Sequence, residues 1–428
     1  MTSRASAQAQ QLQAPYPLAS AAPTAGGGAV SASLLATVLY VCAFFAYVYF
    51  WPISRHLGVP ALAALLAAAL LSIVCARRAY LPGAMIALPV LAGVYVALSF
   101  AGVLPAAWTQ VYDRGAIAQQ SVGYIAMPIL VSANVNALVV LARYPTLVKR
   151  VLVPAGVIGG LVLNPLVLTL FGEPLEGGHS YFLLNSFSGA ELILTALIGW
   201  WVFHALSGVA PFLAVPILIV LTTHLNTALA FLALLVFRTR RLLVLGSLAG
   251  VLLFLATGVV APLFWEPLLA LDANNGIRAV FWGDAWLAVR DTWGVGVGFG
   301  REAIRGVYYF YAEPWSLKRP DEPDFLFIGV HNAVVQAGYR LGILGAVLVV
   351  LLIVRLRPRR SPRTATEQFD AWLFFVFVMV VCSNVAITGM YHLPGVTAVW
   401  AWLALRNDPA CIRTFAIKGE AHVGPTDR

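Results

Sequence analysis

Apolar stretches about as long as a bilayer is thick, separated by short polar segments, dominate the chain. Roughly 20 helical residues span a hydrocarbon core about 30 Å thick. Hydrophobic residues make up 61% of the chain and charged residues only 11%. The pattern predicts an all-α, polytopic integral membrane protein. The candidate spans cover residues 31–53, 57–76, 80–104, 120–142, 151–171, 189–208, 209–237, 242–262, 333–356, 369–389 and 391–406.

Basic residues fall in four short clusters between these spans, with no acidic residue among them. Cytoplasmic loops of membrane proteins carry an excess of Lys and Arg, so all four clusters are expected on the cytoplasmic side. The net charge of +9 therefore reflects topology and does not indicate nucleic-acid binding. The clusters are Arg77 and Arg78; Arg143, Lys149 and Arg150; Arg238, Arg240 and Arg241; and Arg355, Arg357, Arg359, Arg360 and Arg363.

The apolar run 209–237 must cross twice, or dip in and return, for this charge pattern to hold. Two legs would reach roughly 20 Å each at about 1.5 Å per residue, less than a full membrane core. The polar tip near His224 and Asn226 is then expected below the outer surface, in a cavity and not in lipid. This short hairpin brings the expected total to about twelve helices with both termini inside.

The expected organisation has five parts. Residues 1–30 contain a single charge, Arg4, and are too polar and Gly/Pro-rich to bury a core, so disorder is expected there. The four cysteines offer neither a disulfide framework nor metal-ligand spacing. The parts are a cytoplasmic tail (1–30), transmembrane helices 1–9 (31–262), a periplasmic loop (263–332), transmembrane helices 10–12 (333–406) and a second cytoplasmic tail (407–428).

The 263–332 loop is the expected place for a functional site, because it is long, mixed in charge and anchored at both ends by membrane helices. It holds nine of the eighteen acidic residues of the chain. A solvated lid without chemistry is the alternative. Candidates for a general base in this loop are Asp284, Asp291, Glu302, Glu313 and Asp324.

Residues 277–293 of this loop predict a short interfacial helix. At 100° per residue, one helical face would carry Phe281, Trp282, Trp286, Val289 and Trp293. Arg278 projects into that face, where a cation among aromatic rings at headgroup depth needs an anionic partner such as a lipid phosphate. The alternatives are an arginine that snorkels to headgroups or stacks on Trp282.

Three further features follow along the loop. The glycine-rich segment GVGVGFG (294–300) lacks the Lys-Ser/Thr of a phosphate-cradling loop and is expected to be a flexible turn. Arg301 and Arg305 lie four positions apart, on one helical face. His331 and Asn332 then stand at the mouth of the helix expected at 333–356.

This series of motifs resembles the O-antigen ligase and polymerase superfamily of bacterial envelope glycosyltransferases. It consists of Arg278 with Trp282, the glycines from Gly294 to Gly300, His331 with Asn332, a polar position nine residues later, and a G-x-x-G helix (Gly342, Gly345). By motif the resemblance covers residues 220–356. By helix count and loop placement it covers the whole chain.

The resemblance implies a metal-independent enzyme without a cofactor or nucleotide, in the bacterial inner membrane with its site on the periplasmic side. Its donor would be an undecaprenyl-pyrophosphate-linked oligosaccharide. Arg278 would bind the pyrophosphate, and His331 would act on the leaving phosphate or on the acceptor hydroxyl. Membrane lipid is a further partner, and flippase, chain-length and export proteins are additional candidates.

The chain departs from the family pattern at two places. Where many relatives carry Ser-Arg-Gly at the hairpin tip, this chain reads TTHLNT, and Arg340 stands at the family's acidic position. The departures favour an exopolysaccharide or O-antigen polymerase over a lipid A core ligase. A ligase with another acceptor and a transporter of lipid-linked glycan remain alternatives. Candidate substrate-binding residues are Asn332, Arg340, His224, Asn226, Arg290, Arg301 and Arg305.

Overall fold

The protein is described here from a computed structural model of the full chain. Within the residues that the structure describes, the chain is helical apart from one isolated β-bridge between Tyr112 and Arg301, which confirms the all-α class. The described residues are 27–50, 59–105, 112–163, 166–167, 170, 189–207, 210–220, 225–238, 273–301, 330–358, 362–383, 386–387, 389–390 and 392–415.

The helices agree closely with the apolar pattern. Among the described residues, six helical segments are long and apolar enough to cross a membrane, and three shorter apolar helices accompany them. By helix length and hydropathy the chain is thus a multi-pass membrane protein. The bounds are α2 (Gly27–Tyr49), α4 (Val59–Ala76), α5 (Gly83–Ala101), α6 (Arg114–Leu141), α7 (Pro145–Leu147), η1 (Val148–Leu152), α8 (Val153–Ile158), η2 (Gly159–Leu163), α10 (Gly189–His204), α11 (Ala210–Val220), α12 (Leu225–Arg238), α16 (Ala273–Asp291), α18 (Ala333–Arg355), α19 (Ala365–Ser383), α20 (Leu393–Asn407) and α21 (Pro409–Phe415).

Two boundaries differ from expectation, and one expected span cannot be compared. The first helix begins at Gly27, inside the segment expected to be a disordered tail. The second tail begins with a packed helix, α21, whose Cys411 and Phe415 are buried. The expected span 242–262 lies outside the described residues.

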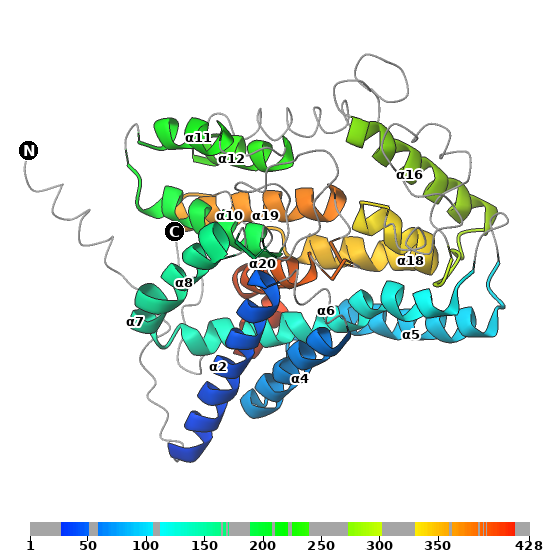
Figure 1. Cartoon of the computed structure of the whole chain (residues 1–428), viewed down its shortest axis with the longest axis horizontal. Helices are drawn as coiled ribbons and strands as arrows, with labels where there is room; N and C mark the ends of the chain where they lie inside the picture. Colours follow the sequence, from blue (N-terminus) through cyan, green and yellow to red (C-terminus); the bar gives the residue numbers. More distant parts are fainter. Residues whose placement is uncertain are drawn as a thin grey trace, which may run out of the picture.

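Helix α6 is the centre of the bundle and is buried along most of its length. It contacts α2, α4, α5 and α20, and Figure 1 shows it running through the middle of the molecule beside α5. The Tyr40 hydroxyl donates to Asn134 Oδ1 (2.9 Å), and Asn134 Nδ2 donates to Thr397 Oγ1 (3.2 Å). Because lipid offers no hydrogen-bond partners, these polar groups of α2, α6 and α20 satisfy one another inside the bundle.

The described members of the four basic clusters lie at one end of the helices, which we call the basic end. Asn136, near the C-terminus of α6, donates to the Arg78 carbonyl (2.9 Å). Arg355 and Tyr80 both donate to the Asp408 carboxylate, and Arg238 donates to two carbonyls at the end of α10. Clusters far apart in the sequence therefore share one side of the bundle, as the positive-inside rule requires.

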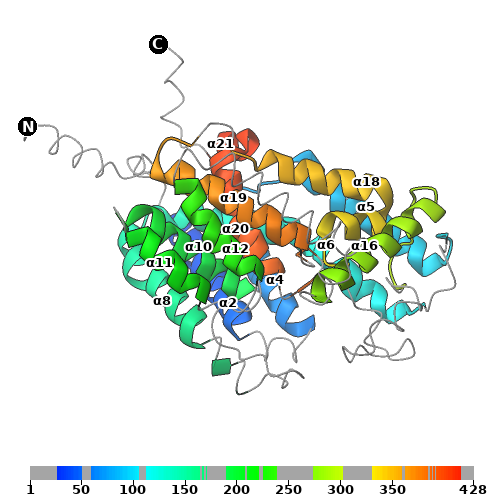
Figure 2. The same cartoon turned by 90° about the horizontal axis from the view of Figure 1, so that it is seen from above.

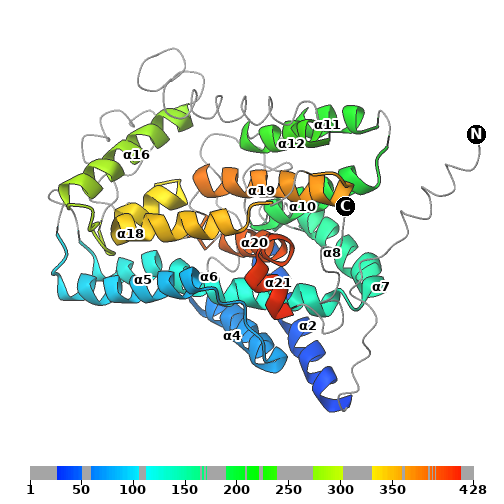
Figure 3. The ribbon, with the colours of Figure 1, turned by 180° about the vertical axis from the view of Figure 1, so that it is seen from behind.

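The apolar run 209–237 forms the helical hairpin that the charge pattern predicts. Helices α11 and α12 pack against each other, with residues 221–224 between them outside the described residues. The two legs comprise 11 and 14 residues. Figures 1 and 3 show the pair lying beside α10 and α19, at the edge of the bundle.

Helix α18 is not the single straight span that its apolar pattern predicts. Gly342 has φ 71° and ψ −173°, which breaks the helix into segments 333–341 and 343–355. A Cβ built on Gly338 would lie only 3.5 Å from the Cβ of Ala346. Residues eight apart in a straight helix are about 12 Å apart along its axis, so the chain folds back sharply at Gly342. Figures 1 and 2 show the two segments of α18 beside each other.

Candidate functional site

Helix α16 contacts the turn that carries His331, which we call the His331 turn (330–332). The Trp282 indole N–H donates to the Val330 carbonyl (2.9 Å). The rings of Phe281 and His331 stack with centroids 5.8 Å apart and planes 25° apart. The structure therefore brings together two segments of the loop that the sequence predicts to hold the site, although 48 residues separate Trp282 from Val330.

Side chains fix the backbone of the His331 turn on both sides. The Val330 amide donates to Gln336 Oε1 (2.8 Å), while its carbonyl accepts from Trp282. His331 itself has φ 54°, in the left-handed region that few non-glycine residues adopt. An unusual backbone conformation held by its surroundings is a frequent property of functional sites. The Trp282 and Gln336 contacts could not be predicted from the sequence, because both depend on the tertiary fold.

Asn332 caps helix α18. Its Oδ1 accepts hydrogen bonds from the amides of Val334 (3.0 Å) and Val335 (3.1 Å), two of the unpaired N–H groups at a helix start. The side chain is largely buried. The predicted substrate-binding role of Asn332 stays a prediction, and its capping role is sufficient to place it directly after His331.

Arg278 lies in α16, one helical turn before Trp282. Its side chain is outside the part of the structure that is described. The position of Arg278 on α16 still places it near the His331 turn, because the next helical turn of α16 contacts that turn. Helix α16 thus places the two residues predicted to be catalytic on adjoining segments.

The helix predicted at 277–293 is present as α16, which ends at Asp291, so Trp293 lies beyond it. Of the residues predicted to share one face, Phe281 and Val289 are buried, whereas Trp286 is 67% exposed. The face that packs on the bundle also includes the small residues Ala285 and Ala288. The predicted membrane-interface role of the tryptophans stays a prediction.

The glycine-rich segment Gly294–Gly300, here called the glycine loop, is an ordered and packed connection. Its four glycines all have φ between 76° and 82°. Each backbone N–H of the loop has a protein acceptor, so none is available to cradle a phosphate. The amides of Gly294 and Val295 donate to the carbonyls of Val289 and Thr292, and the amide of Gly296 donates to the Thr292 hydroxyl. The amides of Val297 and Gly298 donate to the carbonyls of Tyr339 and Arg340. The amides of Phe299 and Gly300 donate to the Ser99 hydroxyl and to Gln120 Oε1.

The glycine loop and the break in α18 fit each other backbone to backbone. A Cβ on Gly296 would lie 2.5 Å from the Gly342 nitrogen, and one on Gly342 would lie 2.4 Å from the Gly294 carbonyl oxygen. The break frees the Tyr339 and Arg340 carbonyls to accept from the loop, and Ile343 N–H donates to Gly294. The glycine-rich segment 294–300 and the glycine at 342 therefore contact each other directly, at a distance that only glycine allows.

Arg301 and Arg340 are drawn into this packing. Arg301 donates to the Pro105 (2.8 Å) and Leu104 (2.9 Å) carbonyls after α5. Arg340 Nη1 donates to the Gly298 (3.1 Å) and Arg301 (2.7 Å) carbonyls, and its side chain is completely buried. Their described contacts brace the glycine loop at the end of the bundle opposite to the basic end.

The remaining candidate site residues are either on the exposed part of α16 or outside the described residues. Arg290 is exposed and pairs with its neighbour Asp291 (2.8 Å), on the side of α16 away from its buried face. Asp284 lies on the same helix and is partly exposed. Arg305, Glu302, Glu313, Asp324 and His224, and the side chain of Asn226, lie outside the described residues.

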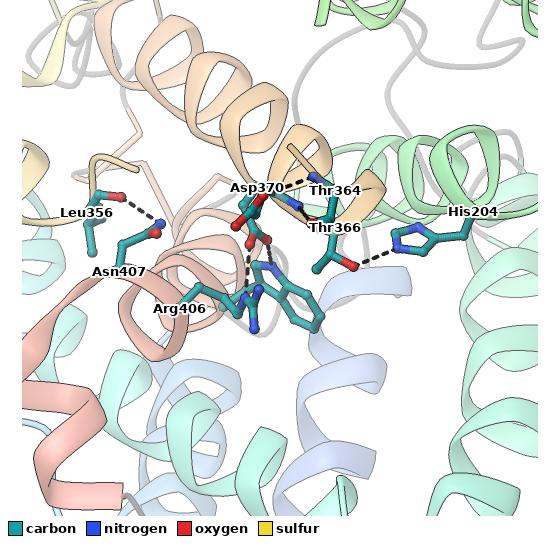
Figure 4. Close-up of polar contacts among 9 residues, drawn as sticks. His204, Leu356, Thr364, Thr366, Asp370, Arg406 and Asn407 are labelled. Atoms are coloured by element: carbon teal, nitrogen blue, oxygen red, sulfur yellow. Dashed lines mark hydrogen bonds and ion pairs between the residues drawn. The ribbon is translucent and has the colours of Figure 1, made fainter. Parts of the chain in front are cut away.

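The basic end carries ion pairs with buried carboxylates, and none of them was predicted as a site. Asp370 accepts from Arg406 (2.9 Å) and the Trp402 indole (2.8 Å), and His204 contacts Thr366 (3.2 Å), as Figure 4 shows. The His204 ring also stacks on Trp200. His204 is therefore a packing residue at the end of α10.

Asp408 links the C-terminus of α20 to two other segments at the basic end. Burial alone would raise the pKa of its carboxyl, but hydrogen bonds from Arg355, Tyr80 and the Ala410 amide together hold the pKa below its ordinary value. Burial and the nearby Asp408 charge raise the pKa of the Cys411 thiol to about 12. This thiol is thus protonated and poorly nucleophilic at neutral pH.

Within the described residues, no group of three or more His, Cys, Asp or Glu side chains is placed to hold a metal ion. The chain matches no known protein family, no curated protein and no solved structure.

Proposed function

We propose that this protein is a membrane glycosyltransferase that polymerises undecaprenyl-pyrophosphate-linked oligosaccharide repeats into exopolysaccharide or O-antigen at the periplasmic face of the inner membrane. In this proposal about twelve helices cross the membrane, with the basic end in the cytoplasm. The segment 263–332 then lies outside. The growing chain would pass from one carrier lipid to the next repeat.

The observation that carries the proposal is the contact between α16 and the His331 turn. Trp282 and Phe281 reach Val330 and His331 directly. Arg278 lies one turn earlier on the same helix. A cationic position and a histidine from distant parts of one loop are therefore neighbours, which supports a joint role in one site.

The bend at Gly342 contacts the glycine loop, at the end of the bundle opposite to the basic end. Because the chain folds back there, the nine residues 333–341, about 14 Å of helix, return from the bend into the bundle. In the proposal the His331 turn therefore lies below the outer end, and the carrier-lipid pyrophosphate would enter between the helices to reach it.

The chemistry of such a transfer needs the residue types present. Breaking the anomeric C–O bond builds negative charge on the departing pyrophosphate, which a fixed cation such as Arg278 would stabilise. The acceptor hydroxyl must lose a proton, and histidine is the side chain whose ordinary pKa best suits that step near neutral pH. In the proposal Arg278 binds the pyrophosphate, and His331 acts on the acceptor hydroxyl or on the leaving phosphate.

Reconstitution of the purified protein in vesicles with lipid-linked repeat units tests the proposal. A ladder of products that grow by one repeat unit supports a polymerase. Transfer of glycan only to an added acceptor would instead identify a ligase. Movement of the lipid-linked glycan between leaflets without any glycosidic bond formation would identify a transporter and refute the enzymatic proposal.

Site variants extend this test. Arg278→Ala and His331→Ala should abolish product while the protein remains folded and inserted. Arg150→Ala is the matched control, because it removes a cation from η1 at the basic end. Full activity of either site variant would remove that residue from the mechanism.

A further inference from the structure

Arg340 is a completely buried cation on the first segment of α18. Its guanidinium donates two hydrogen bonds, both from Nη1, to the backbone carbonyls of Gly298 and Arg301. No carboxylate of the described residues contacts it. Arginine keeps its charge in proteins, so the site holds a full positive charge that no ion pair within the described residues neutralises.

The surroundings offset part of that charge. Arg340 lies in the last turn of the segment that ends at Leu341, where the helix dipole supplies about half a negative elementary charge. The Tyr339 ring lies 4.8 Å from the guanidinium carbon and adds a cation–π contact. Neither contact supplies a formal negative charge, and buried charges are ordinarily paired.

Two buried donors next to this charge lack hydrogen-bond partners in the described structure. They are Nε of Arg340 and the hydroxyl of Tyr124. Both residues flank the same short piece of the glycine loop: Arg340 bonds to the Gly298 carbonyl, and the Tyr124 ring packs on Phe299 with centroids 6.0 Å apart. A buried donor without an acceptor lowers the stability of the folded protein. Two such donors next to one uncompensated charge indicate that an acceptor binds there.

We propose that Arg340 and Tyr124 form a binding site for a monoatomic anion of the halide type, with chloride as the physiological occupant. The site would lie between α6, the glycine loop and the bend of α18. One positive charge and two donors match a monovalent ion. A phosphate group presents several oxygens that each need donors, and the complete burial of the arginine leaves little room for it.

The site would have a definite structural consequence. An anion held there links α6 to the glycine loop and to α18, which meet at the Gly342 bend. A ligand that binds only the folded state stabilises that state by mass action. Because an anion at this site would affect stability and ion binding, the test of the site does not depend on the proposed enzymatic function.

Thermal unfolding of the full-length protein in detergent tests the site. Sodium chloride replaces sodium gluconate at constant ionic strength, because gluconate is too large for a closed site. The melting temperature should rise with chloride and saturate. A melting temperature that does not respond to chloride would overturn the proposal. An equal response to phosphate would overturn the assignment to a monoatomic anion.

Variants assign the effect to these residues. Tyr124→Phe removes one donor and should raise the half-saturating chloride concentration about tenfold, the usual effect of one hydrogen bond. Arg340→Met keeps the length of the side chain but removes its charge, so the chloride response should vanish. Tyr95→Phe is the control, because the Tyr95 hydroxyl donates to the Val295 carbonyl of the same loop (2.6 Å) and should leave the chloride response unchanged.

Bromide provides a direct second measurement that does not depend on the variants. Crystals of the wild-type protein grown in bromide should show an anomalous peak within hydrogen-bond distance of Arg340 Nε and the Tyr124 hydroxyl. No peak there at saturating bromide would overturn the proposal.

Discussion

Replacing Gly296 with alanine tests the backbone contact between the glycine loop and the bend of α18. The added Cβ would lie 2.5 Å from the Gly342 nitrogen and 2.9 Å from the Tyr339 carbonyl oxygen. Both contacts are to backbone atoms, which cannot rotate away as a side chain can. Gly296 also has φ 82°, a conformation that disfavours any residue with a Cβ.

These two effects set the expected magnitude. The left-handed backbone conformation costs roughly 1–2 kcal/mol for alanine, and overpacking of a close contact adds typically about 1–3 kcal/mol. We therefore expect Gly296→Ala to lower the free energy of unfolding by about 2–5 kcal/mol. Thermal or chemical unfolding in detergent, at fixed chloride concentration, measures the loss.

Gly93→Ala is the matched control. Gly93 lies inside α5, and a Cβ built there meets nothing within 4 Å. Alanine in a helix interior is preferred over glycine by roughly 0.5–1 kcal/mol, so this variant should be as stable as the wild type or more so. Equal stability of Gly296→Ala and Gly93→Ala would refute the account of the loop. The double variant Gly296→Ala/Gly342→Ala should be non-additive, because the two residues touch.

Three further predictions follow from the hydrogen bonds. Trp282→Phe removes the donor to Val330, so transferase turnover should fall with little loss of stability, whereas Trp286→Phe, at an exposed position, should leave turnover unchanged; equal turnover of the two variants would contradict the positioning role. Asn332→Ala removes the cap of α18 and should cost about 0.5–2 kcal/mol by unfolding, and no loss would show that the cap is dispensable. Because the folded pKa of Asp408 is depressed, its stabilisation should be complete above the unfolded value near 4 and fade as the pH falls below it; Asp408→Asn should flatten that acid-side slope, and an unchanged slope would assign it to other groups.

The sequence predicted the helices well because hydropathy alone determines which segments can enter a membrane. The requirement that all four basic clusters lie on one side of the membrane correctly predicted that the run 209–237 forms a hairpin, which is the pair α11 and α12. This prediction succeeded because it uses the distribution of Lys and Arg over the whole chain. Local hydropathy alone does not decide between one crossing and two for this run.

The prediction of the site was less complete, for a physical reason. Gly342 looks like a small residue within a helix, and its break becomes evident only when the glycine loop docks on it. The sequence predicts Arg340 to be a substrate ligand in the helix at 333–356, whereas the fold buries it completely. Both properties depend on contacts with residues about forty or more positions away, which local patterns do not encode.

Ladder formation by the reconstituted protein, compared between the wild type and two histidine variants, tests the central proposal most directly. We predict that the wild type extends lipid-linked repeats stepwise, and that His331→Ala lowers the rate by about 10²-fold or more, the usual contribution of a general acid or base. His204→Ala, which alters the histidine stacked on Trp200 at the basic end, should retain the ladder. A wild-type protein that forms no glycosidic bond, or a His331→Ala variant as active as the wild type, would contradict the account.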